Sequence, residues 1–124
     1  MPSERASGLG FPHAVRLRTS RHFDWVFAEP RRSSDLYFTV LGRRPPSCEM
    51  AQTARLGLAI AKRCAPRAVA RNRIKRVIRE SFRHARGSLE FADFVVLCRR
   101  AAVDADNATL NASLAKHWKR FQRR

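Results

Sequence analysis

Residues 66–87 read PRAVARNRIKRVIRESFRHARG, and this stretch decides the fold. Pro66 suits the first turn of a helix, where its missing N–H costs nothing, and Gly87 favours a helix end. At roughly 100° per residue, the apolar and small side chains fall within about 80° of Ile74. They form a stripe of Ala70, Ile74, Val77, Ile78, Ser81, Phe82 and Ala85. The pattern predicts one long helix from Pro66 to about Arg86, buried along this stripe.

The opposite face of the predicted helix is almost entirely cationic. It carries Asn72, Arg73, Lys75, Arg76, Arg79, Glu80, Arg83 and Arg86. Solvated helix faces usually mix both signs of charge and gain from pairs four residues apart, whereas here only Arg76 and Glu80 can form such a pair. Planar guanidinium groups suit bidentate contacts with phosphate. The face therefore predicts a nucleic acid as partner.

Shorter elements are expected upstream. Thr19 and Ser20 can cap a short helix. Its apolar face would hold Phe23, Val26 and Phe27. Residues 36–41 are aromatic and β-branched, which predicts a strand that stops at Gly42. Residues 55–61 alternate bulky and small side chains, which predicts a second strand.

Two further elements are expected downstream. Residues 94–98 form a continuous apolar run of strand length. Asp104 or Asp106 can then cap a last helix. Its buried side would hold Leu110, Leu114, Trp118 and Phe121. The expected order of elements is α-β-β(-β)-α-β-α, which predicts a protein of the α/β class.

Length and charge set the class of protein. The chain has 124 residues and a net charge of +16, with 26 Lys and Arg against 10 Asp and Glu. We expect a single RNA-binding domain over residues 1–124, with residues 1–10 as a disordered tail. No apolar run is long enough for a signal peptide or a membrane span, which predicts a cytoplasmic protein with no membrane partner. Cys48, Cys64 and Cys98 match no zinc-ligand spacing, so free thiols and no metal site are expected.

The sequence gives no indication of catalysis. His13, His22, His84 and His117 are scattered, and neither a pair of carboxylates nor a Ser–His–Asp pattern is evident. Asp24 and Asp93 are the best candidate acids, but a first-turn helix position and a strand edge explain them equally well. We therefore expect no catalytic residue in this chain.

RNA is favoured over DNA because the order of elements matches no helix-turn-helix, zinc module or zipper. Phe23, Phe27, Tyr37 and Phe38 are candidates to stack on unpaired bases. For Phe23 and Phe27, burial in the core is an equally good explanation. A ribosomal or general RNA-chaperone protein, a nucleoid protein and a stand-alone nuclease remain alternatives.

Residues 71–83, Arg-Asn-Arg-Ile-Lys-Arg-Val-Ile-Arg-Glu-Ser-Phe-Arg, resemble the signature of the protein subunit of bacterial ribonuclease P. The preceding strand and basic turn over residues 55–63 are similar to the family too, and the resemblance covers roughly residues 11–121. The sequence Cys64-Ala65-Pro66 departs from the family pattern, in which a Gly and a basic or small residue are common. This departure bears on the shape of the turn.

The resemblance implies an α+β two-layer sandwich with a mostly antiparallel central sheet flanked by three helices. It also implies a left-handed βαβ crossover through the Arg-Asn-Arg helix. It further implies that an RNA subunit is the catalyst and removes the 5′ leader of precursor tRNA, while one protein per RNA assists. Mg²⁺ would be held mainly by RNA, with no cofactor bound by the protein alone. The implied contacts with the RNA subunit are Arg71, Asn72, Arg73, Lys75, Arg76, Arg79 and Arg83. A cleft between this helix and the sheet would hold the leader, through Phe23, Phe27, Phe38, Leu41, Lys62, Arg63 and Arg99.

Overall fold

The computed structural model describes residues 20–44 and 54–123. The expected N-terminal tail, the cap at Thr19 and Cys48 lie outside the described residues. The elements are α2 (Ser20–Ala28), β1 (Arg31–Ser34), β2 (Phe38–Arg43), β3 (Arg55–Ala59), α3 (Ala68–Ala85), the 3-10 turn η2 (Arg86–Ser88), β4 (Asp93–Cys98), α4 (Ala101–Asp104) and α5 (Asn107–Lys119). The predicted order of helices and strands is confirmed.

The four strands form one mixed sheet in the order β1-β2-β4-β3. The pairs β1–β2 and β2–β4 are antiparallel, whereas β3 runs parallel to β4. In the register, Val96 of β4 lies between Val40 of β2 and Leu58 of β3. The expectation of a mostly antiparallel sheet is confirmed.

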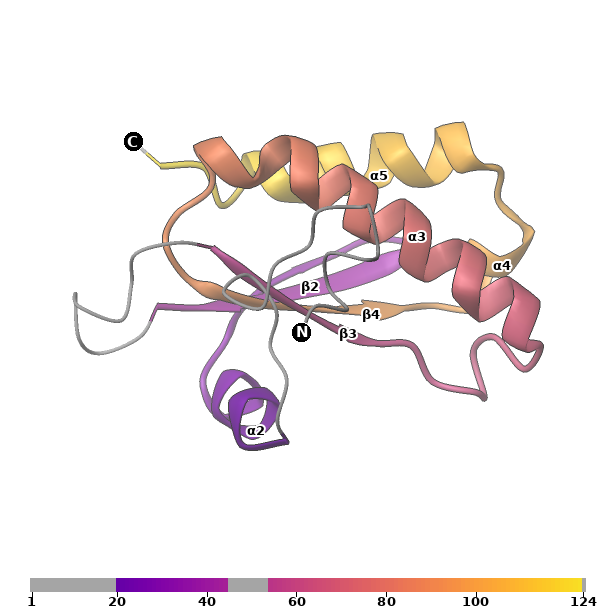
Figure 1. The fold of residues 1–124 in the computed structure, drawn as a ribbon, viewed down its shortest axis with the longest axis horizontal. Helices are drawn as coiled ribbons and strands as arrows, with labels where there is room; N and C mark the ends of the chain where they lie inside the picture. The colour runs from indigo at the N-terminus through magenta and orange to yellow at the C-terminus, as the bar shows by residue number, and fades with distance from the viewer. Residues whose placement is uncertain (1–19, 45–53, 124) are drawn as a thin grey trace, which may run out of the picture.

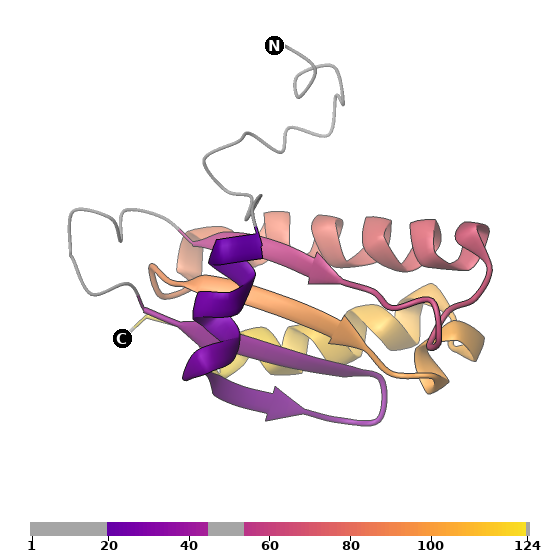
Figure 2. The same ribbon diagram turned by 90° about the horizontal axis from the view of Figure 1, so that it is seen from below.

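The connection from β3 through α3 to β4 is left-handed. In Figure 2, β3 and β4 both point to the right, β3 lies above β4, and α3 lies behind the sheet. A chain that leaves β3, returns behind the sheet and enters the strand below turns in the left-handed sense. Parallel βαβ units are right-handed in nearly all proteins. The rare hand that the family resemblance implied is therefore present.

Helices cover the two faces of the sheet unequally (Figure 1). On one side α3 and α5 enclose the main core, in which Phe94 makes edge-to-face contacts with Phe82, Trp118 and Phe121. On the other side, among the described helices, α2 covers a small cluster around Val26. Burial of Ile74, Val77, Ile78 and Phe82 confirms the predicted helical phase of α3.

Several boundaries differ from the expectations. The first predicted strand begins at Phe38 because Asp35 accepts hydrogen bonds from the backbone N–H groups of Tyr37 and Phe38, which closes a tight turn. The sequence does not predict strand β1, because its residues, RRSS, show no alternation of apolar and polar side chains. Gly42 does not end the strand but lies within it.

Gly42 is required by packing against two aromatic rings. A Cβ at this position would lie 2.9 Å from Cε1 of Phe94 and 3.0 Å from Cε1 of Phe121. We expect Gly42→Ala to lower the free energy of unfolding by about 1–3 kcal/mol, as overpacked cores do. Gly87→Ala is the matched control, because a Cβ there meets nothing within 4 Å. Urea unfolding followed by circular dichroism measures both, and equal losses would contradict this account.

Candidate nucleic-acid interface

The predicted cationic face lies along α3, but its members differ in exposure. Asn72, Arg76 and Arg83 are exposed, whereas Arg71, Arg73, Lys75 and Arg79 are partly buried. Exposed positions on a helix can meet a phosphate backbone directly. The face therefore divides into exposed side chains that a ligand can approach, of which Arg83 also pairs with Glu80, and side chains that are partly buried against the protein.

Arg71 and Arg73 hold neighbouring loops in place. Arg71 Nη1 donates to the carbonyl oxygens of Ala65 and Pro66, both at 2.9 Å. Arg73 donates to Asn107 Oδ1 at 2.7 Å and to the carbonyls of the segment between α4 and α5. Two of the cations predicted to face RNA thus also fix the turn before α3 and the start of α5.

Replacing Arg73 should cost stability, because its carbonyl partners would lose a charged donor. We expect Arg73→Ala to lower the free energy of unfolding by about 1–3 kcal/mol. Arg76→Ala is the matched control, since Arg76 is exposed on the same helix, and it should change stability by less than about 0.5 kcal/mol. Chemical unfolding of the two variants side by side distinguishes them. Similar values would show that Arg73 has no such structural role.

Glu80 partly neutralises the C-terminal half of α3. Its carboxylate pairs with Arg83 Nη2 at 2.5 Å and with His84 Nε2 at 3.1 Å, rather than with Arg76 as expected. The hydrogen bond from Arg83 is the main cause that lowers the pKa of Glu80. The unopposed positive charge is therefore greater toward the N-terminal half of the helix.

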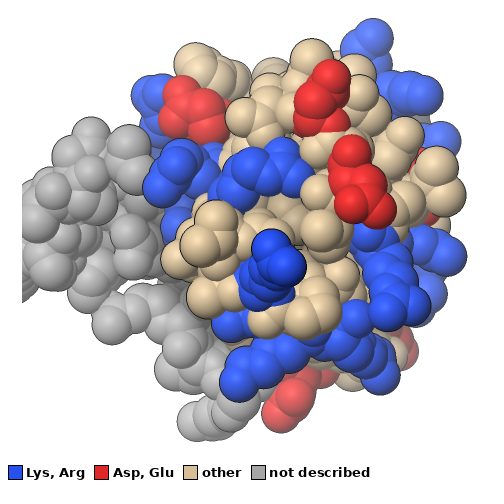
Figure 3. Space-filling model, turned by 90° about the vertical axis from the view of Figure 1, so that its right-hand side faces the viewer, with Lys and Arg blue, Asp and Glu red and all other residues tan. Residues whose placement is uncertain are grey.

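The parallel pairing of β3 and β4 brings further cations to that end. Lys62 and Arg63 follow β3, Arg99 and Arg100 follow β4, and all four side chains are exposed. Carboxyl ends of parallel neighbours lie at the same sheet edge, and α3 starts there too. Figure 3 views this end and shows Lys and Arg side chains spread over much of it, with acids in separate patches. The first residues of the predicted RNA-subunit face, Arg71 to Arg73, thus lie at the same end of the molecule as the predicted leader margin, whereas Arg79 and Arg83 lie farther along α3.

The predicted aromatic cleft between α3 and the sheet is wrong. Phe38 is completely buried in the core that fills this space, and Leu41 is 2% exposed beneath α2, so neither can meet a base. Strand alternation places them on opposite faces, and helices cover both. Phe23 packs partly buried beside Leu41 and Val95, whereas Phe27 is 41% exposed. Of the four apolar candidates, Phe27 is the one that offers a large free ring surface.

Helix α2 is fixed to the sheet by an interaction that sequence reasoning missed. The Arg43 guanidinium lies 4.3 Å from the centre of the Trp25 ring and donates to the Trp25 carbonyl at 2.6 Å. Its second partner is Glu29, at 3.8 Å. Beyond α2, the same sheet face is not covered by any described helix (Figure 2), and Ala59 and Leu97 on it are only partly buried. Among the described residues, this sheet face therefore keeps partly exposed apolar side chains beyond α2.

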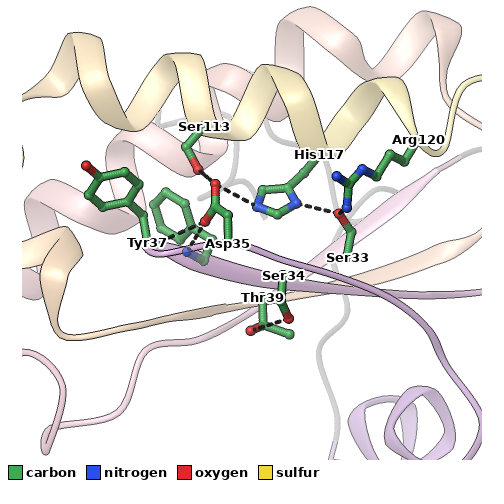
Figure 4. A network of polar contacts seen from close by, with 9 residues as sticks. Ser33, Ser34, Asp35, Tyr37, Thr39, Ser113, His117 and Arg120 are labelled. Carbon is green, nitrogen blue, oxygen red and sulfur yellow. Dashed lines mark hydrogen bonds and ion pairs between the residues drawn. The ribbon is translucent and has the colours of Figure 1, made fainter.

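A Ser–His–Asp arrangement, which the sequence did not indicate, lies under α5 (Figure 4). His117 Nδ1 is 2.6 Å from Ser33 Oγ, and Nε2 is 3.3 Å from Asp35 Oδ2. Ser113 donates to the same carboxylate at 2.5 Å, and Arg120 donates to Ser33 Oγ at 2.9 Å. The network links the β1–β2 hairpin to the last helix.

This arrangement is structural rather than nucleophilic. Ser33 and His117 are each 2% exposed, so no substrate can reach the hydroxyl. A carboxylate facing Nε2 favours a proton on that nitrogen, which leaves Nδ1 to accept from Ser33. The other candidate acids are also explained: Asp93 forms a bidentate ion pair with Arg55 at 2.7 and 2.8 Å, and Asp24 is exposed on α2.

Two opposing influences set the charge of Asp35. Burial on its own would raise the pKa, but hydrogen bonds from Ser113, Phe38 and Tyr37, aided by His117, outweigh it and lower the pKa from 3.8 to about 2. Burial lowers the pKa of His117 despite the attraction of Asp35, so the neutral ring is favoured in the fold. Both shifts stabilise the folded state above the unfolded pKa and are lost on acidification.

Acid should therefore weaken the link between the hairpin and α5. Because the folded pKa of Asp35 is below its unfolded value, its contribution is complete above about pH 5 and is lost as the pH falls through about 2. We expect Asp35→Asn to lower the free energy of unfolding by about 1–2 kcal/mol at neutral pH and to flatten its fall between those limits. Asp24→Asn is the exposed control. Unfolding free energies measured across this range test the prediction, which an unchanged pH profile in Asp35→Asn would contradict.

Over residues 20–44 and 54–123, no three His, Cys, Asp or Glu side chains come together as a metal site would require. Within the same ranges, no helix has the length and apolarity needed to cross a membrane.

Comparison with known proteins places the fold and the basic surface in one family. A family model described as Ribonuclease P matches residues 11–122. The ribonuclease P protein component of Thioalkalivibrio sulfidiphilus is 48% identical over 112 residues, which cover 90% of each chain. That of Photorhabdus laumondii is 46% identical over 115 residues, covering 93% of each chain. The chain belongs to the ribonuclease P protein family.

Solved structures of the family agree in fold. The RNase P protein from Thermotoga maritima has a TM-score of 0.74 at 30% identity, covering 87% of this chain and 98% of that one. The Staphylococcus aureus RNase P protein has a TM-score of 0.76 at 25% identity, covering 86% and 93%. The predicted family, the fold class and a role in tRNA processing as an RNA-binding component of ribonuclease P are confirmed. The assignment of individual residues to RNA contacts stays a prediction.

Proposed function

We propose that this chain is the accessory subunit of a ribonucleoprotein endonuclease whose catalytic centre lies in the RNA. One protein binds one ribonuclease P RNA in the cytoplasm and assists removal of the 5′ leader from precursor tRNA. Mg²⁺ is held mainly by RNA phosphates, whose hard oxygen atoms suit it. The protein contributes fixed positive charge and binds no cofactor by itself.

One observation carries this proposal: the exposed cations of two sequence segments converge on the end of the molecule where α3 begins. Asn72 and Arg76 on α3 lie toward the same end as Lys62, Arg63 and Arg99 at the sheet edge. Phosphate backbones attract such clusters and release counterions on binding. We assign the exposed α3 face to the RNA subunit and the sheet edge to the substrate.

The leader is assigned to the α2 side of the sheet, in place of the filled space beneath α3. Phe27 of α2 offers a partly exposed ring on this side of the sheet, where Ala59 and Leu97 are only partly buried. A base can stack on such a ring with little sequence preference. The leader would run from this strip toward the cations that end β3 and β4.

The α3 assignment is tested by reconstitution with ribonuclease P RNA. Arg76→Ala should weaken the complex and reduce the slope of log affinity against log salt by about one unit, as loss of one phosphate contact does. Lys116→Ala removes an equally exposed charge from α5 and is the matched control. Equal effects of the two variants would mean that the RNA does not favour the α3 face.

The leader assignment is tested with the reconstituted enzyme at low Mg²⁺. Phe27→Leu should reduce the affinity advantage of a substrate with a several-nucleotide leader over one with a single leader nucleotide, by up to about 1–3 kcal/mol per stacked base. Phe91→Leu is the matched control, because its ring contacts Arg123 away from α2. If neither variant affects the advantage, Phe27 does not stack. If the wild type shows no leader preference at all, a general RNA-chaperone role is favoured instead.

A further inference from the structure

A cavity of about 340 Å³ opens at the basic end of the molecule, between the turn that precedes α3 and the short helix α4. Its lining residues come from both segments and are Cys64, Pro66, Arg100, Ala101, Val103 and Asp104. Pro66, Ala101 and Val103 make much of the wall apolar, and Arg100 and Asp104 add one charge of each sign. An apolar wall with a few polar groups is typical of a site for a small ligand or a single ligand group.

Two arginines of α3 hold the walls of this cavity in place. On one side, Arg71 Nη1 donates to the carbonyl oxygens of Ala65 and Pro66, each at 2.9 Å. On the other side, Arg73 Nη2 donates to the carbonyl oxygen of Val103 at 3.1 Å. Both walls are thus anchored to the first turns of the same helix. The fold itself keeps the cavity in shape, which spares a ligand the cost of ordering it.

The two charged groups of the cavity are available to a ligand. Arg100 and Asp104 are both exposed, and among the described residues no hydrogen bond or ion pair engages either side chain. Arg100 can therefore contact a phosphate, and Asp104 can accept hydrogen bonds. A ligand that uses the whole cavity would combine an anionic group, a flat apolar body and an edge of hydrogen-bond donors. A nucleotide has this combination.

Among the four bases, the carboxylate of Asp104 favours guanine. A carboxylate offers two acceptor oxygens side by side. On its Watson–Crick edge, guanine presents two adjacent donors, N1–H and the N2 amino group, whereas each other base presents a single donor group beside acceptors. Guanine alone can therefore form a bidentate pair with the carboxylate while its ring lies against the apolar wall.

We propose that this cavity holds the base of one unpaired guanosine of the RNA subunit, with Asp104 on its Watson–Crick edge and Arg100 on a neighbouring phosphate. The inference rests on the proposed function, in which α3 faces that RNA. Arg71 and Arg73, which hold the walls, belong to the same face of α3. A site that reads a base suits an RNA of fixed sequence, whereas leaders differ from one precursor to another. The RNA subunit is therefore a better source of the guanosine than the leader.

The test uses the full chain reconstituted with ribonuclease P RNA and probed with kethoxal. This reagent modifies N1 and N2 of unpaired guanosines, the two atoms that Asp104 would contact. We expect the wild-type chain to protect at least one guanosine. Asp104→Asn should raise the reactivity of that guanosine by at least about fivefold, the lower end of what a bidentate base contact supplies. Asp24→Asn makes the same change of charge on the exposed side of α2 and should leave the protection intact.

A second variant blocks the cavity without any change of charge. Ala101→Leu adds apolar volume to the lining and should expose the same guanosine to kethoxal as Asp104→Asn does. Circular dichroism confirms that each variant is folded, and a gel shift confirms that the RNA is saturated with protein before it is probed. Loss of protection then reports on the cavity and not on dissociation of the complex.

The possible outcomes separate this inference from the proposed function. If the wild-type chain forms no complex with the RNA, both fail. If the complex forms but every guanosine reacts alike with wild type, Asp104→Asn and Ala101→Leu, this inference alone is overturned. GMP is then titrated into the free chain and followed by the backbone amide signal of Ala101 in NMR spectra. Saturation by GMP at concentrations as low as the RNA requires would assign the cavity to a free nucleotide and would overturn its assignment to RNA.

Discussion

Parallel pairing of β3 with β4 is the constraint on which the arrangement of the basic surface depends. Two adjacent parallel strands cannot be joined by a hairpin, so the chain must return across the sheet through α3. The carboxyl ends of both strands and the amino end of α3 then lie at one edge. Lys62 and Arg99, distant in sequence, become neighbours of the Arg-Asn-Arg segment through this pairing alone. A right-handed crossover would have placed β3 on the other side of β4, which β2 occupies.

A net charge of +16 opposes compaction, and the structure uses several of its arginines to offset this. Arg71 and Arg73 satisfy backbone carbonyls, Arg43 lies over Trp25, and Arg55 forms a bidentate pair with Asp93. Each of these contacts turns a repelling charge into a tertiary link. The arginines therefore divide into those that support the fold and those, such as Arg76, that remain exposed for a ligand.

The sequence predicts those parts that depend on local periodicity. The stripe around Ile74, the apolar run of β4 and the cap of α5 by Asp106 are all present, because each rests on residues within one or two turns of one another. Side-chain partners set by the tertiary structure were not predictable in this way. Ser33 and His117 lie 84 positions apart, and only the docking of α5 brings them together.

The same limit explains the outcome for the candidate leader site. Alternation in a strand shows that Phe38 and Leu41 point to opposite faces, but not that helices cover both faces at those positions. The exposure of Phe27 likewise depends on how α2 packs on the sheet. Contacts between Arg43 and Trp25 help to fix that packing, and neither residue belongs to the predicted apolar face of α2.

A surface of this composition recognises a class of ligand rather than a sequence. Phosphate contacts supply affinity and position without reading bases, and stacking on an aromatic ring accepts every base. The exposed groups near the sheet edge, Lys62, Arg63 and Arg99 with Phe27 toward α2, offer these two kinds of contact. Under the proposed function, such a surface can accept the varied leaders of many precursor tRNAs. Selection of the cleavage site would then rest with the RNA subunit, and the protein would add affinity that is nearly uniform across substrates.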